Sequence, residues 1–266
     1  MLRLMRGPTL ILAAIPFAMA TAASGDPICA DRPGKSSETC TAPAGHWQVE
    51  AGLADWSLQR SDGERDTSLV IGETTIKCGL SDRSDIEIDV TPWQRQTSRT
   101  GSSRDSANGV GDVRIQYKRQ LTASDAALQL SAYPYVKIPT ARRPLGNGKW
   151  EAGLLVPIGY SIPKSPISIG LTPEFDWVAN GDGRGHHLAM TQVVNVGWQA
   201  SDAINLSAEI WRAWDCDPAG TQRQLSADGA AAYLVNQDVQ LDAGINVGLN
   251  RATPDLELYA GFSKRF

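Results

Sequence analysis

A strict alternation of apolar and polar residues near the C-terminus is the feature that most constrains the fold. From Val239 to Leu249 every odd position is apolar and every even position is polar or glycine, and the pattern resumes from Leu256 to Phe262. Successive side chains of a strand point to opposite sides, so a period of two predicts strands with one apolar and one polar face. Residues 250–254 suit a tight connection. We therefore expect an antiparallel hairpin.

The same period recurs along residues 45–266 and predicts twelve strands. Turns after the even-numbered strands are short, and connections after the odd-numbered strands are mostly longer and more polar; 59–66 and 96–108 are expected to be loops. This arrangement is typical of bacterial outer-membrane barrels. We predict an all-β fold, a transmembrane antiparallel up-and-down β-barrel of about 12 strands, with both termini in the periplasm. Phe266 resembles the terminal aromatic residue read by the barrel-assembly machinery, and we expect it to be an assembly signal.

The N-terminus carries a different signal. Arg3 and Arg6 precede an apolar run, 10–20, and small residues follow it, which predicts a signal peptide over 1–23. The run is too short to span a membrane as a helix. Residues 24–44 lack any period and are rich in proline, so we expect an irregular periplasmic segment before the barrel at 45–266. In an exported chain Cys29 and Cys40 are expected to form a disulfide.

Charge and composition limit the partners. The formal net charge is −4, and no basic cluster or stripe appears, which argues against a nucleic-acid partner. Hydrophobic residues make up 42%, a value that fits a barrel or a soluble sandwich equally well. The partners we expect are outer-membrane lipid, the barrel-assembly machinery and a small-molecule solute.

Polar residues opposite the apolar faces are expected to line the lumen of the barrel. They either pair across the lumen and stiffen it or line a narrow solute path, because unpaired buried charge is costly. Inward tyrosines could stack an aromatic solute or pack within the lumen. The lumen-lining candidates are Glu50, Glu87, Asp89, Arg114, Lys118, Tyr133, Tyr135, Lys137, Glu151, Glu174, Asp176, Glu209, Asp242, Glu257 and Tyr259, and Lys77, Trp211, Asp228 and Arg265 share their parity.

Three stretches resemble a known family. They are 29–40 with its Asp31-Arg-Pro-Gly, 109–118 (GVGDVRIQYK), and 241–249 continuing through 255–266. They resemble the outer-membrane β-barrel family named for the phenol-degradation meta-pathway, whose members are described as transporters. The resemblance implies a channel for small, aromatic or hydrophobic compounds and no catalytic site. Cys78 stands where such strands usually have an aromatic or aliphatic residue.

A hydrolase and a structural or adhesive barrel are the two other functions that the sequence allows. A hydrolase would need a base near a nucleophile or water. His186 and His187 adjoin a Gly-rich loop near Asp182, but adjacent strand residues face opposite ways. We therefore expect no enzyme, no catalytic residue, no metal and no cofactor. A structural or adhesive surface barrel with a plugged lumen is the alternative. The favoured prediction is an outer-membrane channel for passive passage of small solutes.

Overall fold

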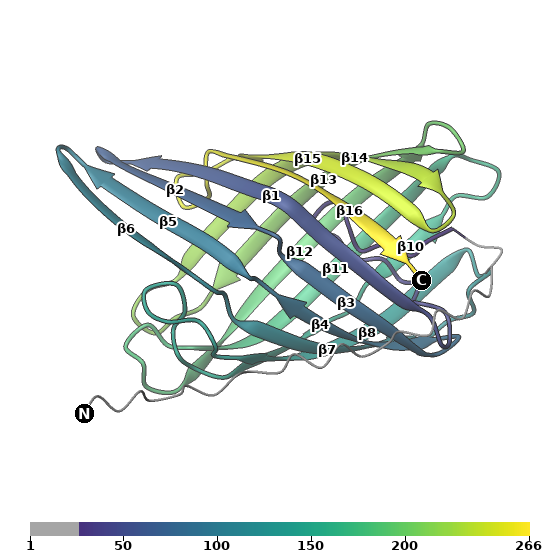
Figure 1. The fold of residues 1–266 in the computed structure, drawn as a ribbon, viewed down its shortest axis with the longest axis horizontal. Helices are drawn as coiled ribbons and strands as arrows, with labels where there is room; N and C mark the ends of the chain where they lie inside the picture. The colour runs from purple at the N-terminus through teal and green to yellow at the C-terminus, as the bar shows by residue number, and fades with distance from the viewer. Residues whose placement is uncertain (1–26) are drawn as a thin grey trace, which may run out of the picture.

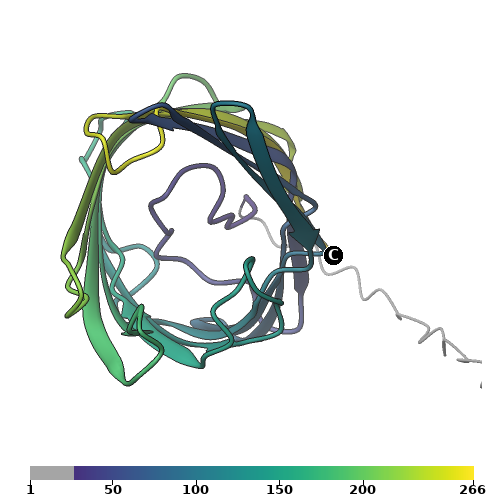
Figure 2. The same ribbon diagram turned by 90° about the vertical axis from the view of Figure 1, so that its left-hand side faces the viewer.

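The computed structural model describes residues 27–266, which form one closed antiparallel barrel (Figures 1 and 2). β16 pairs with β1 and closes the wall. Over these residues no helix is long and apolar enough to cross a membrane. The predicted signal peptide, 1–23, lies outside the described residues. The strands are β1 (Trp47–Ser61), β2 (Glu64–Ile71), β3 (Thr74–Ser81), β4 (Ser84–Val90), β5 (Trp93–Thr100), β6 (Ser103–Gly109), β7 (Val113–Gln120), β8 (Leu128–Ile138), β9 (Glu151–Leu155), β10 (Ile158–Ser161), β11 (Ile167–Ala179), β12 (His186–Gln199), β13 (Ile204–Asp215), β14 (Gln222–Asn236), β15 (Val239–Gly248) and β16 (Leu256–Arg265).

These sixteen segments make twelve barrel strands, because four strands are each interrupted once. β2 and β3 both pair with β1 and are separated at Gly72, whose φ of 72° is left-handed. Pro92 separates β4 from β5, and Pro157 separates β9 from β10, since proline has no N–H for the ladder. The fourth break, 110–112, separates β6 from β7. The predicted barrel of twelve strands is confirmed.

Two hairpins extend beyond the rest of the rim, at the left of Figure 1. We call them the wing, residues 55–71 of β1 and β2 together with 93–109 of β5 and β6. The prediction of loops at 59–66 and 96–108 is therefore wrong: tight turns with positive φ at Asp62, Gly63 and Gly101 connect paired strands there. Toward its tip, over residues 59–68 and 94–106, the wing is polar on both faces, so this part lacks the apolar period by which the other strands are recognised.

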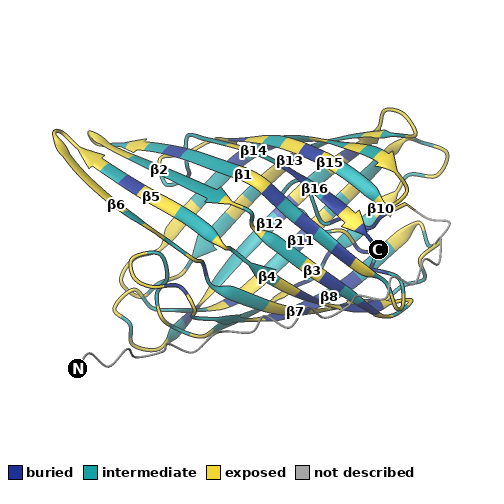
Figure 3. Ribbon diagram, in the orientation of Figure 1, coloured by how far each residue is buried: buried dark blue, intermediate teal, exposed yellow. Residues whose placement is uncertain are grey.

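Burial is inverted relative to a soluble protein (Figure 3). Lys77 and Lys118 are 1% and 0% exposed, whereas Leu80 and Trp177 are 55% and 56% exposed. An apolar outer surface and a polar interior are what a barrel surrounded by lipid requires. Cys78 shares the outward parity of Leu80 on β3. The exposed aromatic residues near strand ends include Trp47, Tyr160, Trp177, Trp198 and Phe266.

Candidate functional site

Residues 27–44, here called the plug segment, lie inside the barrel (Figure 2). The segment is irregular, and it occupies the lumen at the end of the short turns: the Ile28 backbone N–H donates to the Gln237 carbonyl, 2.8 Å away, in the turn between β14 and β15. The predicted disulfide between Cys29 and Cys40 is confirmed, with 6.0 Å between the Cα atoms. The segment sits there because its polar groups pair with polar side chains that the strands turn inward.

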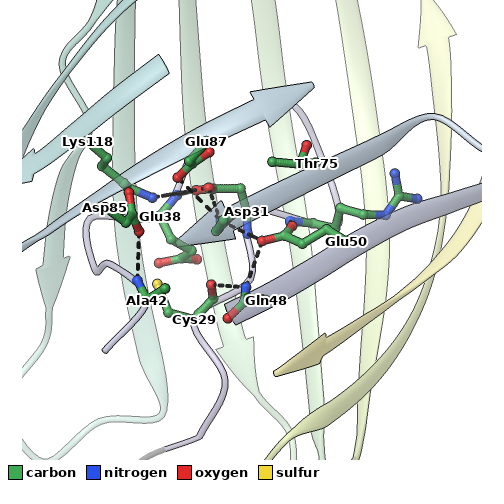
Figure 4. Close-up of polar contacts among 12 residues, drawn as sticks. Cys29, Asp31, Glu38, Ala42, Gln48, Glu50, Thr75, Asp85, Glu87 and Lys118 are labelled. Atoms are coloured by element: carbon green, nitrogen blue, oxygen red, sulfur yellow. Dashed lines mark hydrogen bonds and ion pairs between the residues drawn. The ribbon is translucent and has the colours of Figure 1, made fainter. Parts of the chain in front are cut away.

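Asp31 is the centre of the largest ionic cluster (Figure 4). Its carboxylate forms ion pairs with Lys77 of β3 and, at 2.8 Å, with Lys118 of β7. Tyr133 of β8 donates to Asp31 Oδ2 at 2.8 Å and to Glu87 Oε2 at 2.7 Å. Burial would raise the pKa of Asp31, but the Lys118 and Lys77 ammonium groups outweigh it and hold that pKa well below its usual range. Asp31 therefore stays charged and joins three strands.

Two side chains of β1 hold the backbone of the plug segment. Glu50 of β1 accepts from the backbone N–H groups of Asp31 and Arg32, at 3.2 and 3.1 Å. Gln48 Nε2 donates to the Cys29 carbonyl at 2.6 Å and to Glu50 at 2.8 Å. These hydrogen bonds hold the backbone of the plug segment in place, in addition to the ion pairs of its side chains.

The opposite wall holds the segment through Arg32, Lys35 and Ser36. Arg32 Nη2 lies 2.9 Å from Asp242 Oδ1 on β15. Glu209 on β13 accepts from the Lys35 N–H at 2.8 Å and from the Ser36 hydroxyl at 2.5 Å. Gly34, between them, has a φ of 99°, and a Cβ atom there would lie 2.7 Å from Glu209 Oε1, so only glycine fits.

The remaining contacts complete the circuit of the lumen. Thr39 donates to Gln129 on β8 at 2.6 Å, Ser37 N–H donates to Thr172 on β11 at 3.3 Å, and Ala42 N–H donates to Asp85 on β4 at 2.7 Å. Contacts with the plug segment thus reach strands on every side of the barrel. The segment narrows the lumen and is tethered around its whole circumference.

Glu38 is the acidic group of the plug segment that faces the lumen. Its side chain is accessible, yet the barrel wall encloses it. That enclosure weakens its solvation and, together with the charge of Asp31, raises the pKa of Glu38. The pKa of Asp31 is therefore lowered and the pKa of Glu38 is raised, although both residues belong to one short segment.

A second cluster lies beyond the plug segment, toward the wing end of the lumen. Arg114 lies over the Tyr135 ring, with 4.1 Å from Cζ to the centroid, and Tyr135 donates to Asp176 at 2.5 Å. Glu174 lies on the same strand, two positions from Asp176. Lys137 pairs with Glu151 at 2.7 Å and with Asp112 at 3.1 Å. Four carboxyl groups therefore lie around two basic groups here, and the ion pairs of this cluster are those of Lys137.

The inward aromatic rings each carry a basic group on one face. Besides Tyr135, these are Tyr133 beneath Lys118, Trp211 beneath Lys35 and Tyr259 near Arg32, with 4.7, 4.5 and 5.9 Å from the cation to the ring centroid. A solute could therefore stack only on the other face of such a ring. Each ring thus packs against a basic group inside the barrel on one of its faces.

The other candidates lie in smaller pairs. Asp89 accepts from Thr75 at 2.7 Å and from Gln116 at 2.6 Å, and Glu257 accepts from Asn246 at 2.8 Å. The alternating pattern of the strands does not extend to the plug residues that bind the lumen groups: Asp31, Arg32, Lys35, Ser36 and Thr39. The sequence offered one signal for a role of this segment: residues 27–44 carry four charged side chains and the two cysteines of the disulfide.

The rim histidines face opposite ways. His187 is buried, with Nε2 2.5 Å from Asp215 Oδ1 and Nδ1 2.9 Å from Asn180 Oδ1. His186 stacks on Trp177. The backbone N–H groups of Ala219 and Gly181 lower the pKa of Asp217 nearby. No group of three or more His, Cys, Asp or Glu side chains could hold a metal ion among residues 27–266.

Comparison with known proteins adds a family and a fold. Residues 30–266 match a family model described as "Putative MetA-pathway of phenol degradation". Among solved structures, an outer membrane channel from Pseudomonas putida F1 has a TM-score of 0.69 at 16% identity, covering 88% of this chain and 99% of that chain. The translocator domain of the autotransporter NalP from Neisseria meningitidis has a TM-score of 0.54 at 13% identity, covering 85% and 90%. No curated protein matches the chain.

Proposed function

The chain belongs to the phenol-degradation meta-pathway family of outer-membrane β-barrels, and from this premise we propose that it is a channel for passive passage of small solutes. The family name and the similarity to an outer membrane channel support solutes that are small aromatic or hydrophobic compounds. The role is transport and not catalysis.

The observation that carries this proposal is a tethered segment inside a polar lumen. The plug segment, seen inside the barrel in Figure 2, is held by ion pairs and hydrogen bonds from many strands, and most of the buried side chains among residues 27–266 are polar or charged. A solute must pass between this segment and the wall, where charged groups face it. Such a path admits small molecules and excludes large ones.

The orientation is part of the proposal. The plug segment, Phe266 and the short turns lie at one end of the barrel, and the wing and longer connections lie at the other (Figure 1). Short turns of bacterial outer-membrane barrels are periplasmic. Both termini would then face the periplasm, Phe266 would be available to the barrel-assembly machinery, and the wing would face the outside.

A plugged structural or adhesive barrel is the second candidate. The circuit of contacts around the plug segment favours it, because each contact opposes displacement. The two candidates differ in one measurable property: only a channel conducts.

The test is the conductance of the refolded mature chain in planar bilayers, with neutral aromatics or aromatic acids on one side. We compare it with Asp31→Asn/Arg32→Gln, which weakens the plug contacts, and with Asp62→Asn/Arg60→Gln, which makes the same charge changes in the wing. A channel gives small steps that one solute class blocks, larger steps in the first variant and unchanged steps in the second. Correctly folded, heat-modifiable protein that never conducts overturns the proposal in favour of the plugged barrel.

A further inference from the structure

Four arginines form one rung across the wing. In the strand register Arg60 of β1 is opposite Arg65 of β2, Arg65 is opposite Arg99 of β5, and Arg99 is opposite Arg104 of β6. Arg95 lies four positions before Arg99 on β5 and shares its face. Like charges directly opposite each other destabilise a sheet. The sequence shows no such cluster, because strand pairing alone assembles it.

The charges of the wing are sorted by face. Arg65, Arg95, Arg99 and Arg104 line one cavity of about 260 Å³ together with Trp56 and Leu69. Asp66 and Asp105 have the opposite parity and line a cavity of about 530 Å³ with Pro144 and Pro254, which belong to loops over the barrel mouth. The basic face therefore points away from the barrel axis, and the acidic face points over the lumen.

The basic face continues directly from the lipid-facing wall. Ile71, 44% exposed, is paired with Trp93, and both share the face of Arg95. Trp47 and Trp56 are nine positions apart on β1, which is about 23 Å along the barrel axis after strand tilt and matches the ~25 Å apolar band. The rung begins at Arg60, four positions beyond Trp56. It therefore lies at the level of lipid headgroups.

Protein groups do not neutralise this face. None of the five arginines takes part in an ion pair with any residue of 27–266. Neighbouring strands lie about 4.8 Å apart and residues four apart on a strand about 13 Å, so the guanidinium groups spread over an area as large as a headgroup. Guanidinium groups bind phosphate through paired N–H donors.

We propose that the outer face of the wing binds the phosphate groups of a multiply phosphorylated glycolipid in the outer leaflet, with Arg65, Arg95, Arg99 and Arg104 as ligands. Trp56 and Leu69 contact the upper part of its acyl chains. The inference goes beyond solute passage, and it depends on the proposed orientation in which the wing faces outward.

The test is native mass spectrometry of the mature chain in detergent with bis-phosphorylated lipid A. The variant is Arg65→Gln/Arg95→Gln/Arg99→Gln/Arg104→Gln. The control removes the same charge from exposed positions at the same end of the barrel, as Arg142→Gln/Arg184→Gln/Arg223→Gln/Arg251→Gln. Wild type and control should retain the lipid, and the variant should bind at least tenfold more weakly, while all three remain folded by heat modifiability.

Three results would overturn the proposal. Equal binding by wild type and variant removes the arginines from the site. Equal binding of phosphatidylglycerol and lipid A reduces the site to general attraction for anionic lipid, and equal competition by free pyrophosphate reduces it to a phosphate site without a lipid. Lipid binding in detergent depends neither on conductance nor on orientation. It can therefore be interpreted even if the protein proves not to be a channel.

Discussion

Arg32 of the plug segment and Asp242 of β15 are joined side by side although 210 positions separate them: Arg32 Nη2 and Nε lie 2.9 and 3.2 Å from Asp242 Oδ1. The pair is shielded, since the Asp242 side chain is fully covered. It is therefore an attachment point whose strength depends on the planar guanidinium group.

Arg32→Lys should loosen the plug segment, because a lysine ammonium cannot reproduce two parallel donors from one plane. The expected loss is about 1.5–3 kcal/mol, the usual range for hydrogen bonds to charged groups. Hydrogen exchange of plug peptides should accelerate about tenfold for each 1.4 kcal/mol. Arg251→Lys, at an exposed position, is the control; unchanged exchange in Arg32→Lys would show that this pair does not hold the segment.

Removing the disulfide should weaken the plug segment without detaching it. Cys29 and Cys40 are 11 positions apart, and closing a loop of that length stabilises by about 3 kcal/mol in the chain-entropy model. In Cys29→Ser/Cys40→Ser the ion pairs of Asp31 and Arg32 remain, so we expect noisier single-channel currents and a lower denaturation midpoint. Cys216→Ser is the matched control. Currents as quiet as those of wild type would mean that the ion pairs alone fix the segment.

Glu38 should control how ion selectivity varies with pH. Because its pKa is raised, Glu38 becomes neutral on acidification at a pH above the ordinary glutamate value of about 4.3, whereas Asp31, with its lowered pKa, stays charged. Reversal potentials in a salt gradient should show cation preference at neutral pH, and this preference should fall as the pH decreases through the pKa of Glu38. Glu38→Gln should have the lower cation preference at neutral pH and should match wild type once Glu38 is protonated, and Glu64→Gln in the wing should resemble wild type. A midpoint that survives in Glu38→Gln would assign the effect to another group.

The barrel was predictable because lipid imposes a rule on every strand. Leu241 and Leu258 are apolar because both face lipid, and the residues that alternate with such positions along each strand are free to be polar. Beyond the membrane no lipid requires every second residue to be apolar, so the sequence around Arg65 and Arg99 has no alternation that would indicate a strand. For this reason the paired strands of the wing were expected to be loops.

The contents of the lumen were only partly predictable. The alternation of apolar and polar residues predicted that Glu50, Glu209 and Asp242 face the lumen. It could not predict which group each carboxylate binds. That partner lies in an irregular segment up to 210 positions away, where no period places a side chain. Asp31 belongs to a stretch that resembles the family, but its role is evident only from its contacts with Lys77, Lys118 and Tyr133.

Cys216 offers a test of orientation without an engineered residue. It is an exposed free cysteine in the connection after β13, at the end of the barrel opposite the plug segment. A membrane-impermeant maleimide should therefore label intact cells that carry the wild-type chain. Label should be absent in Cys216→Ser, because Cys78 is on the lipid-facing side of β3 and Cys29 and Cys40 are bonded to each other. Cys78→Ser should keep full labelling. If Cys216 reacts only after the outer membrane is permeabilised, the wing faces the periplasm, and both the periplasmic termini and access of the arginine face to the outer leaflet are ruled out.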